Sequence, residues 1–395
     1  MNMKKTMNTF FALAAVSLAL VATSCSDGNG PGVEDGGFIV DRNDLRGEIR
    51  GEEVVLESGT YKLTGRLVIE NGGKLTIKPG VKIEATTVAA NEFASVRYIA
   101  VAQGGRIDVQ GTASSPVVMT AAEAVPGSWG GLVVCGKAPI NKGASAAAEV
   151  SDLTYGGTDP NDNSGSIKYL RIEYSGFAYN SEKEFNGLSL FGVGKGTTIE
   201  YVQVYEGSDD GVEWFGGTVD ARYLIVNNAA AEVGDDLFDW TEGWNGTGEN
   251  WYGIRTNNGN RGIEADNNAN DHLADPISSP TIRNLTLVGN GEGGAEPQAI
   301  KLRVGTKGIF DNVVLANWKT GFDIQHDESI GYVADGSLGA TNVRFVNVRT
   351  KSVAKKTDGT EVDVESTLYT ENPGATGAGA GEAVPSWAEG WTVGL

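Results

Sequence analysis

The chain has very little cysteine, histidine and proline: two, two and eleven residues among 395. Of the two cysteines, Cys25 ends an N-terminal leader and Cys135 lies in the apolar run GLVVCG, where we expect a buried small side chain, so the fold does without disulfides. The histidines, His272 and His326, belong to no Cys/His cluster with metal-ligand spacing. The sequence therefore excludes a disulfide-stapled scaffold and a zinc-finger type of site.

Positive charge is also scarce, since 31 Lys and Arg residues face 51 Asp and Glu residues, giving a formal net charge of -20. This excess argues against nucleic acid as a partner, because polyanions are repelled by such a surface. It favours neutral or cationic ligands, or acidic ligands bridged by a metal ion. Beyond the leader, no apolar run is long enough to cross a bilayer.

The leader has a basic start, the apolar run FFALAAVSLALVA and then ATSC. This pattern predicts a secretory signal peptide over residues 1–24. ATSC resembles a bacterial lipobox, which implies that Cys25 is lipidated and that residues 25–51 tether the fold to a membrane. The alternative is cleavage by ordinary signal peptidase, which leaves Cys25 as a free thiol. In Gram-negative lipoproteins an Asp after the cysteine favours the inner membrane, so Ser26 implies outer-membrane, surface-exposed localisation through the lipid anchor.

The rest of the chain repeats. RLVIENGGKLTIKPG (66–80) is echoed by YIAVAQGGRIDVQG (98–111), with their glycine pairs 32 residues apart. Two types of strand then recur. The apolar anchors of the shorter type are Leu132, Leu188, Val212, Phe238, Ile263, Ile300 and Phe322, several of them 22 to 26 residues apart. The longer type aligns on Leu170, Val202, Leu224, Leu285, Val313 and Val346.

Short strands, Gly or Asn turns and a period near 25 residues predict an all-β, single-stranded, right-handed parallel β-helix over residues 52–395, with long Asn/Asp/Gly-rich loops. A β-sandwich is the main alternative, but it would show hairpin turns between neighbouring strands instead of a fixed long period. The segments SDDGVEWFGGTVDARYLIV, GDDLFDWTEGWNG and SWAEGWTVGL resemble a family of bacterial surface lipoproteins with a pectin-lyase-like β-helix. The resemblance implies that fold and a cell-surface location.

Strand periodicity predicts two columns of outward-facing residues, one for each type of strand. The longer strands give a mostly neutral column, Arg171, Gln203, Ile225, Thr286, Val314 and Asn347. The shorter strands give an acidic one, Ser189, Glu213, Asp239, Glu264, Lys301 and Asp323. Stacked carboxylates repel one another, so a cation, a ligand or nearby basic residues must offset the repulsion. We therefore expect Glu213, Asp239, Glu264, Lys301 and Asp323 to form a ligand-binding face.

Two Asp pairs precede the acidic strands, Asp209-Asp210 and Asp235-Asp236. Asp before a strand often closes a turn by bonding backbone, and this is one interpretation of both pairs. The other is that the four carboxylates bind a metal ion, for which calcium is the best candidate because it accepts several oxygen ligands in loose geometry.

Trp244 follows the second acidic motif and is expected either to stack on a sugar ring or to cap the core. Together these features favour a non-catalytic surface lipoprotein that binds carbohydrate or another surface polymer through its acidic face. Two alternatives stay open at this point. One is a polysaccharide lyase or glycoside hydrolase that uses the acidic column, and the other is a structural subunit of an outer-membrane protein complex.

Overall fold

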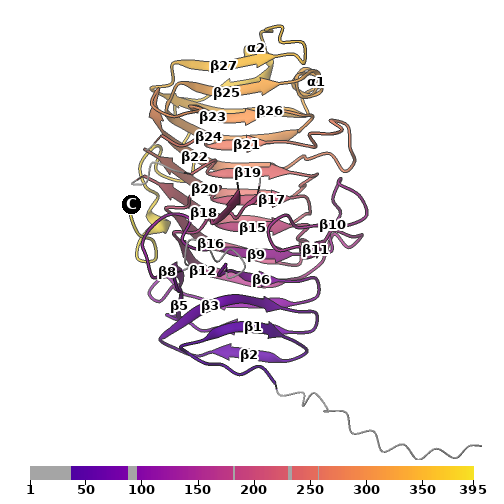
Figure 1. The fold of residues 1–395 in the computed structure, drawn as a ribbon. Coiled ribbons are helices and arrows are strands. Elements are labelled where there is room, and N and C mark those ends of the chain that lie inside the picture. Colours follow the sequence, from indigo (N-terminus) through magenta and orange to yellow (C-terminus); the bar gives the residue numbers. More distant parts are fainter. Residues whose placement is uncertain (1–36, 88–95, 181–182, 230–233, 257) are drawn as a thin grey trace, which may run out of the picture. The chain divides into compact units, whose positions relative to one another are not determined.

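The computed structural model describes residues 37–87, 96–180, 183–229, 234–256 and 258–395. In this part of the chain, parallel strands stack coil upon coil along one axis into a parallel β-helix (Figure 1). Twenty-four strands join one continuous sheet. The prediction of an all-β parallel solenoid is therefore confirmed. Cys25 and the expected signal peptide lie outside the described residues.

One side of the solenoid, here called the short-strand face, carries one short strand from each coil. It begins with β1 (Leu45–Ile49) on the second half of β3 (Thr60–Ile69). The strands that follow in order are β6 (Ile99–Val101), β9 (Leu132–Cys135), β15 (Leu188–Phe191), β17 (Val212–Phe215), β19 (Phe238–Thr241), β21 (Ile263–Ala265), β23 (Gln298–Leu302), β25 (Thr320–Gln325) and β27 (Thr350–Lys355).

The opposite side, the long-strand face, is built from strands of up to 11 residues. It consists of β12 (Gly165–Glu173), β16 (Thr198–Tyr205), β18 (Ala221–Asn228), β20 (Thr247–Arg255), β22 (Thr281–Gly291), β24 (Gly308–Trp318), β26 (Leu338–Val346) and β28 (Tyr369–Glu371). In the first coils two shorter ladders take its place. They are β2 (Glu53–Leu56), β4 (Lys74–Ile77) and β7 (Arg106–Gln110), and the first half of β3 with β5 (Lys82–Ala85) and β8 (Val117–Ala121).

Small elements decorate the coils. Two antiparallel hairpins project beside the short-strand face: β10 (Ala146–Ala147) with β11 (Thr154–Tyr155), and β13 (Ala178–Asn180) with β14 (Lys183–Glu184). Helices α1 (Asp327–Asp335) and α2 (Glu365–Leu368) lie near the last coils, and η2 (Ser386–Ala388) lies in the C-terminal segment. Among the described residues, no helix combines the length and hydropathy needed to cross a membrane.

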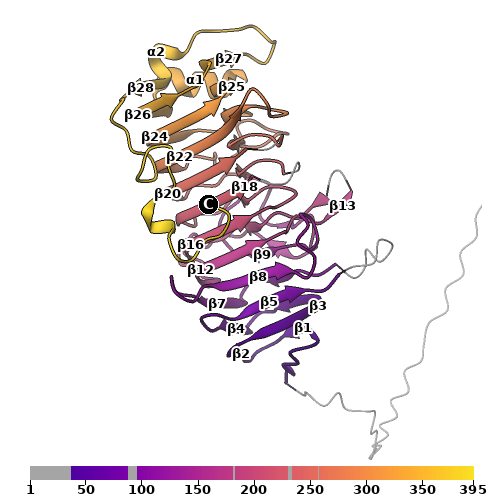
Figure 2. The ribbon, with the colours of Figure 1, turned by 90° about the vertical axis from the view of Figure 1, so that its left-hand side faces the viewer.

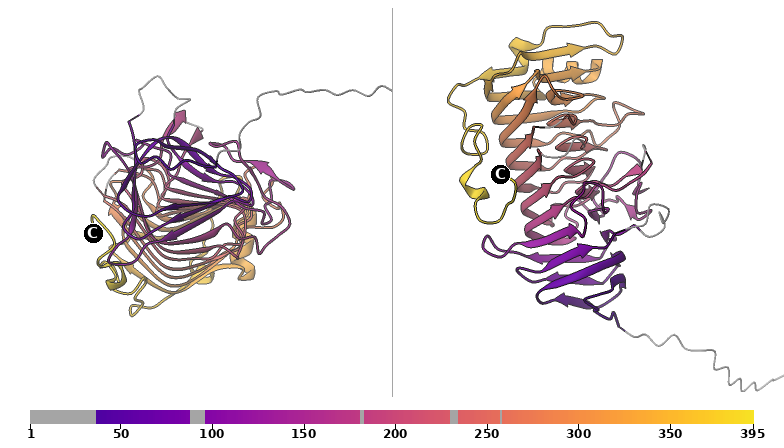
Figure 3. Two further views of the ribbon diagram at one scale, coloured as in Figure 1. Left: turned by 90° about the horizontal axis from the view of Figure 1, so that it is seen from below. Right: turned by 60° about the vertical axis from the view of Figure 1, so that its left-hand side comes forward.

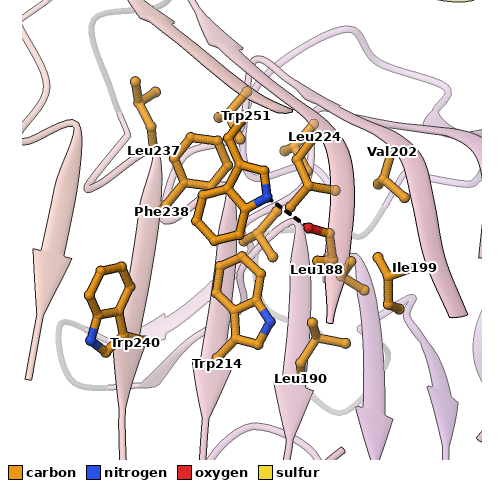
Figure 4. Close-up of a cluster of buried hydrophobic side chains, with 14 of the residues drawn as sticks. Leu188, Leu190, Ile199, Val202, Trp214, Leu224, Leu237, Phe238, Trp240 and Trp251 are labelled. Atoms are coloured by element: carbon orange, nitrogen blue, oxygen red, sulfur yellow. Dashed lines mark hydrogen bonds between the residues drawn. The ribbon is translucent and has the colours of Figure 1, made fainter. Parts of the chain in front are cut away.

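The core lies inside the coils, seen end-on in Figure 3. All seven predicted anchors of the short strands are buried and stack in register, from Leu132 to Phe322. Phe238 and Trp214 both stack on Trp251, with ring centroids 4.8 and 4.9 Å apart (Figure 4). Each buried indole also needs a hydrogen-bond acceptor, and Trp251 Nε1 donates to the carbonyl of Ala221 at 3.0 Å. Stacked aromatic side chains therefore fill the core of the middle coils.

Three boundaries and alignments differ from the prediction. The solenoid begins before residue 51, because β1 already pairs in parallel with β3 inside the range expected for the tether. On the long-strand face Val343, not Val346, pairs with Val313, so Arg344 replaces Asn347 in the outer column. The alignment also missed β20, whose Trp251 pairs with Leu224 and Leu285.

The neutral column of the long-strand face is covered by the chain itself. The C-terminal segment (372–395) runs back along this face (Figure 2), and Gln203, Ile225 and Thr286 beneath it are fully buried. Gln203 exchanges two hydrogen bonds with the backbone of Val393, at 2.7 and 2.9 Å. This column faces out of the sheet, as predicted, but into a second, smaller core and not into solvent.

Candidate acidic binding site

The acidic residues of the short strands form one column in the predicted order. Glu213 on β17 pairs with Asp239 on β19, and Asp239 pairs with Glu264 on β21. The column continues through Lys301 on β23 to Asp323 on β25. Each step is one strand spacing, about 4.8 Å, so the carboxylates are held close by the backbone itself.

A second column runs beside it at the turns that precede these strands. Backbone bonds between consecutive coils place Asn186, Asp210, Asp236 and Arg261 at equivalent positions. Asp210 Oδ1 accepts a hydrogen bond from the backbone N–H of Asp236 at 2.7 Å, and Asp236 Oδ1 accepts one from Arg261 at 2.6 Å. These two aspartates therefore bond the turn of the next coil, whereas the turn interpretation expected each to close its own.

The two columns together bring carboxylate oxygens into three overlapping groups. Within each group one oxygen from every residue lies within 4.8 Å of the others. The groups are Asp209–Asp210–Asp235, Asp210–Glu213–Asp239 and Asp236–Asp239–Glu264. Of the residues predicted to bind a metal, all four aspartates belong to these groups, and so do three members of the acidic column. We call the seven residues of these groups the acidic cluster.

Burial and mutual repulsion raise the pKa values of six residues of the acidic cluster: Asp209, Asp210, Glu213, Asp236, Asp239 and Glu264. Loss of solvation is the main cause, and neighbouring carboxylates add to it, so the pKa values of Asp210, Glu213 and Asp239 lie well above their usual range. The same causes raise the pKa of Asp209 to about 8. Burial likewise raises the pKa of Glu264 to about 7, although Arg261 and Arg303 pull it down. Without a counter-ion the cluster therefore resists full ionisation at neutral pH.

In the described residues, basic side chains form ion pairs only with the far end of the cluster, although the buried Arg255 also attracts Asp210, Asp235 and Asp236. Arg261 is 5 % exposed and forms ion pairs with Asp236 at 3.1 Å, with Glu264 at 2.8 Å and with Glu296. Arg303 bonds Glu264 and Asp266. At the near end Glu213 accepts a hydrogen bond from the neutral amide of Asn186 at 2.6 Å. Charge compensation is thus weakest around Asp209, Asp210, Glu213 and Asp239.

Lys301 and Asp323 lie in the column as predicted but outside the acidic cluster. Lys301 is adjacent to Glu264 in register, yet its ammonium pairs with Glu296 at 3.1 Å. Asp323 is 6 % exposed, and its carboxylate accepts hydrogen bonds from the side chain of Gln325. Neither residue belongs to the three carboxylate groups. They extend the column without contributing to the acidic cluster.

Trp244 corrects one prediction outright. Its side chain is fully buried, stacks on Trp214 at 4.6 Å and donates from Nε1 to the carbonyl of Val219 at 3.1 Å. No face of the ring is available to a sugar, so the core-capping interpretation is the correct one. The turn after β19 bends inward at this residue, and a turn carries no periodic pattern that would reveal it.

Sequence reasoning overlooked several participants. Asn186 lies two residues before Leu188, as Asp210 lies before Val212, so the same spacing would have found it. Glu296 and Asp266 come from loops and carry no such signal. The two histidines meet although 54 residues separate them: their ring centroids lie 4.9 Å apart, and His272 Nδ1 bonds Glu328 at 2.9 Å.

The family of the chain follows from its sequence and agrees with this architecture. Residues 47–392 match the family model described as a pectate-lyase like beta helix domain. The match spans most of the chain, and the chain belongs to this family. No curated protein matches the chain in sequence.

Proposed function

We propose that the protein is a surface-anchored, non-catalytic binding protein whose acidic cluster holds calcium and presents it to carbohydrate or another surface polymer. The observation that carries the proposal is the set of three overlapping carboxylate groups on one rigid face. Crowded carboxylates that outnumber their basic partners are costly to keep ionised, and a divalent cation reduces that cost.

Calcium fits the chemistry of this donor set. All seven residues of the cluster offer carboxylate oxygens, the ligands that calcium prefers, and no histidine or cysteine is among them. Calcium binds oxygen at about 2.3–2.6 Å, so two oxygens on one ion lie at most about 5 Å apart. The 4.8 Å limit within each group meets this condition. Magnesium is a poorer fit because it demands near-octahedral geometry at shorter distances.

A bound calcium ion would also favour a polysaccharide as the ligand. A bound ion with open coordination positions attracts hydroxyl and carboxylate oxygens, which are the groups that a polysaccharide displays. It would offset the net charge of -20, which otherwise repels acidic polymers. Each of the three groups includes at least one partly buried aspartate, Asp209 and Asp235 in the first and Asp239 in the other two, so an ion held there would be accessible from one side.

Anchoring is the second part of the proposal. The leader, the lipobox-like ATSC and Ser26 support lipidation at Cys25 and attachment to the outer membrane. Attachment would place the solenoid where surface glycans and outer-membrane protein complexes are the available partners. A structural role in such a complex stays compatible with the acidic cluster as a calcium-stabilised docking surface.

Calorimetry tests the calcium site directly. Titration of calcium into the soluble form that begins at Ser26 should show binding, and Asp239→Asn, which removes a shared member of two groups, should weaken it at least about tenfold. Glu389→Gln, an exposed carboxylate on the C-terminal segment, is the matched control and should bind like the parent. A glycan array probed with calcium and with EGTA then tests the polymer. Absence of calcium heat in the folded parent would refute the proposal.

A catalytic role is the second candidate, because raised pKa values near neutrality suit acid–base chemistry. Burial raises the pKa of Asp236 to about 6 and that of Glu264 to about 7. Against it, Lys301 and Arg261 are held in ion pairs and are poor candidates for a free base. Incubation with acidic and neutral polysaccharides, followed by assays for new reducing ends and unsaturated ends, decides between the two. Product that disappears in Glu264→Gln would favour the enzyme.

A further inference from the structure

A second cavity, of about 640 Å³, opens beside the first coils. Its walls come from β1 and β3, from the loop between β10 and β11, and from hairpin β13–β14. This volume lies within the range of about 300–1,000 Å³ that is usual for small-molecule sites.

The two sides of the cavity carry opposite charge. Arg46 and Arg66, on β1 and β3, together with Lys183 on β14, supply three cations. The loop before β11 supplies two carboxylates, Glu149 and Asp152. The net charge of the lining is therefore close to +1, in a chain whose total charge is -20.

In the described residues no ion pair joins the opposite charges across the cavity, although burial raises the pKa of Glu149 and Lys142 and Lys183 lower it. Arg46 pairs with Asp44 at 3.0 Å and Arg66 with Glu48 at 3.4 Å, and both acids lie outside the lining. Among the described residues, no ion pair joins either carboxylate of the loop to the three cations. Both arginine side chains remain about 60 % exposed, so they are free to reorient toward a ligand. Charges of both signs are thus kept apart and accessible.

The rest of the lining suits an organic ligand and not a bare ion. Tyr98 and Tyr179 both line the cavity and are held in place by contacts with Phe185, at ring centroid distances of 5.2 and 5.8 Å. Ser151 lines the cavity as well, and its buried hydroxyl has no hydrogen-bond partner. An unsatisfied buried hydroxyl is costly, and a ligand amide would satisfy it.

The acidic loop is fixed by its own backbone. Asp152 N–H donates to the carbonyl of Ala148, and Ala148 N–H donates to that of Leu153, both at 2.9 Å. Asp152 adopts the left-handed conformation, with φ 57°, which Asp tolerates better than most residues. The loop therefore presents Ser151 and Asp152 in a defined geometry.

From this arrangement we infer that the cavity binds a short zwitterionic peptide. Its carboxylate would lie against Arg46, Arg66 and Lys183, its ammonium against Glu149 and Asp152, and an aromatic or apolar side chain against the tyrosines. A neutral sugar leaves both sets of charges without a partner, and a monoanionic sugar leaves the carboxylates without one. Polyanions are excluded by the two acids and by the charge of the whole chain. This site shares no residue with the acidic cluster, although Glu149 is close enough to Glu213 and Asp209 to raise their pKa values.

The test uses the dipeptide alanyl-tyrosine and two derivatives as calorimetric probes of the soluble form that begins at Ser26. The free dipeptide should bind, whereas its N-acetylated and C-amidated forms, which each lose one charge, should bind about 3- to 10-fold more weakly. Glucose and glucuronate serve as the neutral and monoanionic sugars and should bind more weakly than the dipeptide.

Two variants test which charged residue of the cavity binds each end of the dipeptide. Arg66→Gln should weaken the free dipeptide but leave the C-amide unchanged, and Asp152→Asn, which keeps a residue tolerant of the left-handed conformation, should weaken the free dipeptide but leave the N-acetyl form unchanged. Both variants should retain the calcium heat of the parent, which also reports that they fold. Equal binding of the three dipeptide forms, tighter binding of glucuronate, or no dipeptide heat at about 10 mM would overturn the inference.

Discussion

Burial governs the charge state of individual carboxylates in the acidic cluster. Asp210, which is 7 % exposed, accepts a backbone hydrogen bond but forms no ion pair in the described residues, whereas Asp236 accepts a backbone hydrogen bond and also pairs with Arg261. The pKa of Asp210 accordingly lies well above its usual range, and that of Asp236 rises only to about 6. Neighbouring acids of one type thus differ because only one of them forms an ion pair.

This difference predicts how stability depends on pH. In the unfolded chain these acids titrate near pH 4, whereas in the folded chain several titrate between about 6 and 8. The folded state therefore binds more protons in that window, and the free energy of unfolding should fall as pH rises from about 5 to 8 in EDTA, by up to about 1.4 kcal/mol per pH unit for each proton involved.

Urea unfolding at several pH values measures this slope. Calcium should flatten it by stabilising the ionised form, and Asp239→Asn should reduce it in EDTA because one titrating group is gone. Acids whose pKa is lowered by ion pairs, such as Glu84 with Lys62 and Lys82, titrate below this window and do not contribute. Stability in EDTA that is constant or rises from pH 5 to 8 would contradict the prediction.

Among single residues, the acidic column was predictable and Trp244 was not. Period-two alternation fixes which residues of a strand share a side, and the fixed repeat length fixes which of them are neighbours in the next coil. Glu213, Asp239 and Glu264 followed from these two rules. Trp244 belongs to a turn, where neither rule applies, and its burial depends on the space left by Trp214 and Trp251.

Individual strands of the long-strand face bend at one position that repeats from coil to coil. Asn250, Asn284 and Asn312 all adopt left-handed φ values, 59°, 58° and 56°. Their amides form a ladder, in which Asn284 donates to Asn250 at 3.1 Å and accepts from Asn312 at 2.8 Å. In earlier coils the same bend carries stacked tyrosines, with Tyr201 at 4.3 Å from Tyr169 and 4.4 Å from Tyr223.

A pair of substitutions at Asn284 separates the contribution of its side-chain hydrogen bonds to stability from that of its left-handed backbone conformation. Asn284→Gly keeps the left-handed conformation without strain but removes both ladder bonds, and it should lower the free energy of unfolding by about 1–2 kcal/mol. Asn284→Ala removes the bonds and also forces an ordinary residue into the left-handed region, which should cost about 1–2 kcal/mol more. Chemical denaturation of the two variants gives both values. Equal stability of the Gly and Ala variants would show that the backbone conformation relaxes.

Strand register was predictable where a strand carries two apolar residues in alternation, and the prediction of register failed where this pattern changes. β26 offers both Val343 and Val346 as anchors, and the sequence alone does not distinguish them; the partner Val313 selects Val343. β20 was missed because its inward positions are Trp251 and Gly253, an aromatic and a glycine in place of the usual aliphatic pair.

In the solenoid as a whole, the least predictable feature is the return of the C-terminal segment along the long-strand face. Trp391 is fully buried against Tyr169 and Tyr201, at ring centroid distances of 5.7 and 6.0 Å, although about half the chain separates them. Contacts between Gln203 and Val393 span 190 residues. Repeat proteins are dominated by contacts between adjacent coils, and a segment that crosses many coils has no periodic signal.

The C-terminal segment also determines which face of the solenoid is open to a ligand. It covers Gln203, Ile225 and Thr286 on the long-strand face, so that face is already occupied (Figure 2). On the short-strand face Asp210 and Asp236 of the acidic cluster are buried, but Asp209, Asp235 and Asp239 remain partly exposed. A ligand can therefore reach the cluster through these three residues, in agreement with the binding role proposed for it.

Whether a polymer can reach the protein also depends on the membrane to which the protein is attached, and the N-terminal leader predicts that attachment. If Cys25 is lipidated, the full chain should fractionate with the outer membrane and be extracted only by detergent. Cys25→Ser removes the acylation site, so the variant should remain as an unprocessed precursor or appear in the soluble fraction. Ser26→Asp keeps the lipid and changes only the sorting residue, so the protein should stay detergent-extractable but move to the inner membrane.

Membrane fractionation with mass spectrometry of the mature N-terminus measures all three outcomes. A mature, unlipidated parent chain that still sediments with the outer membrane would disprove anchoring through Cys25 and would leave the calcium-binding proposal intact.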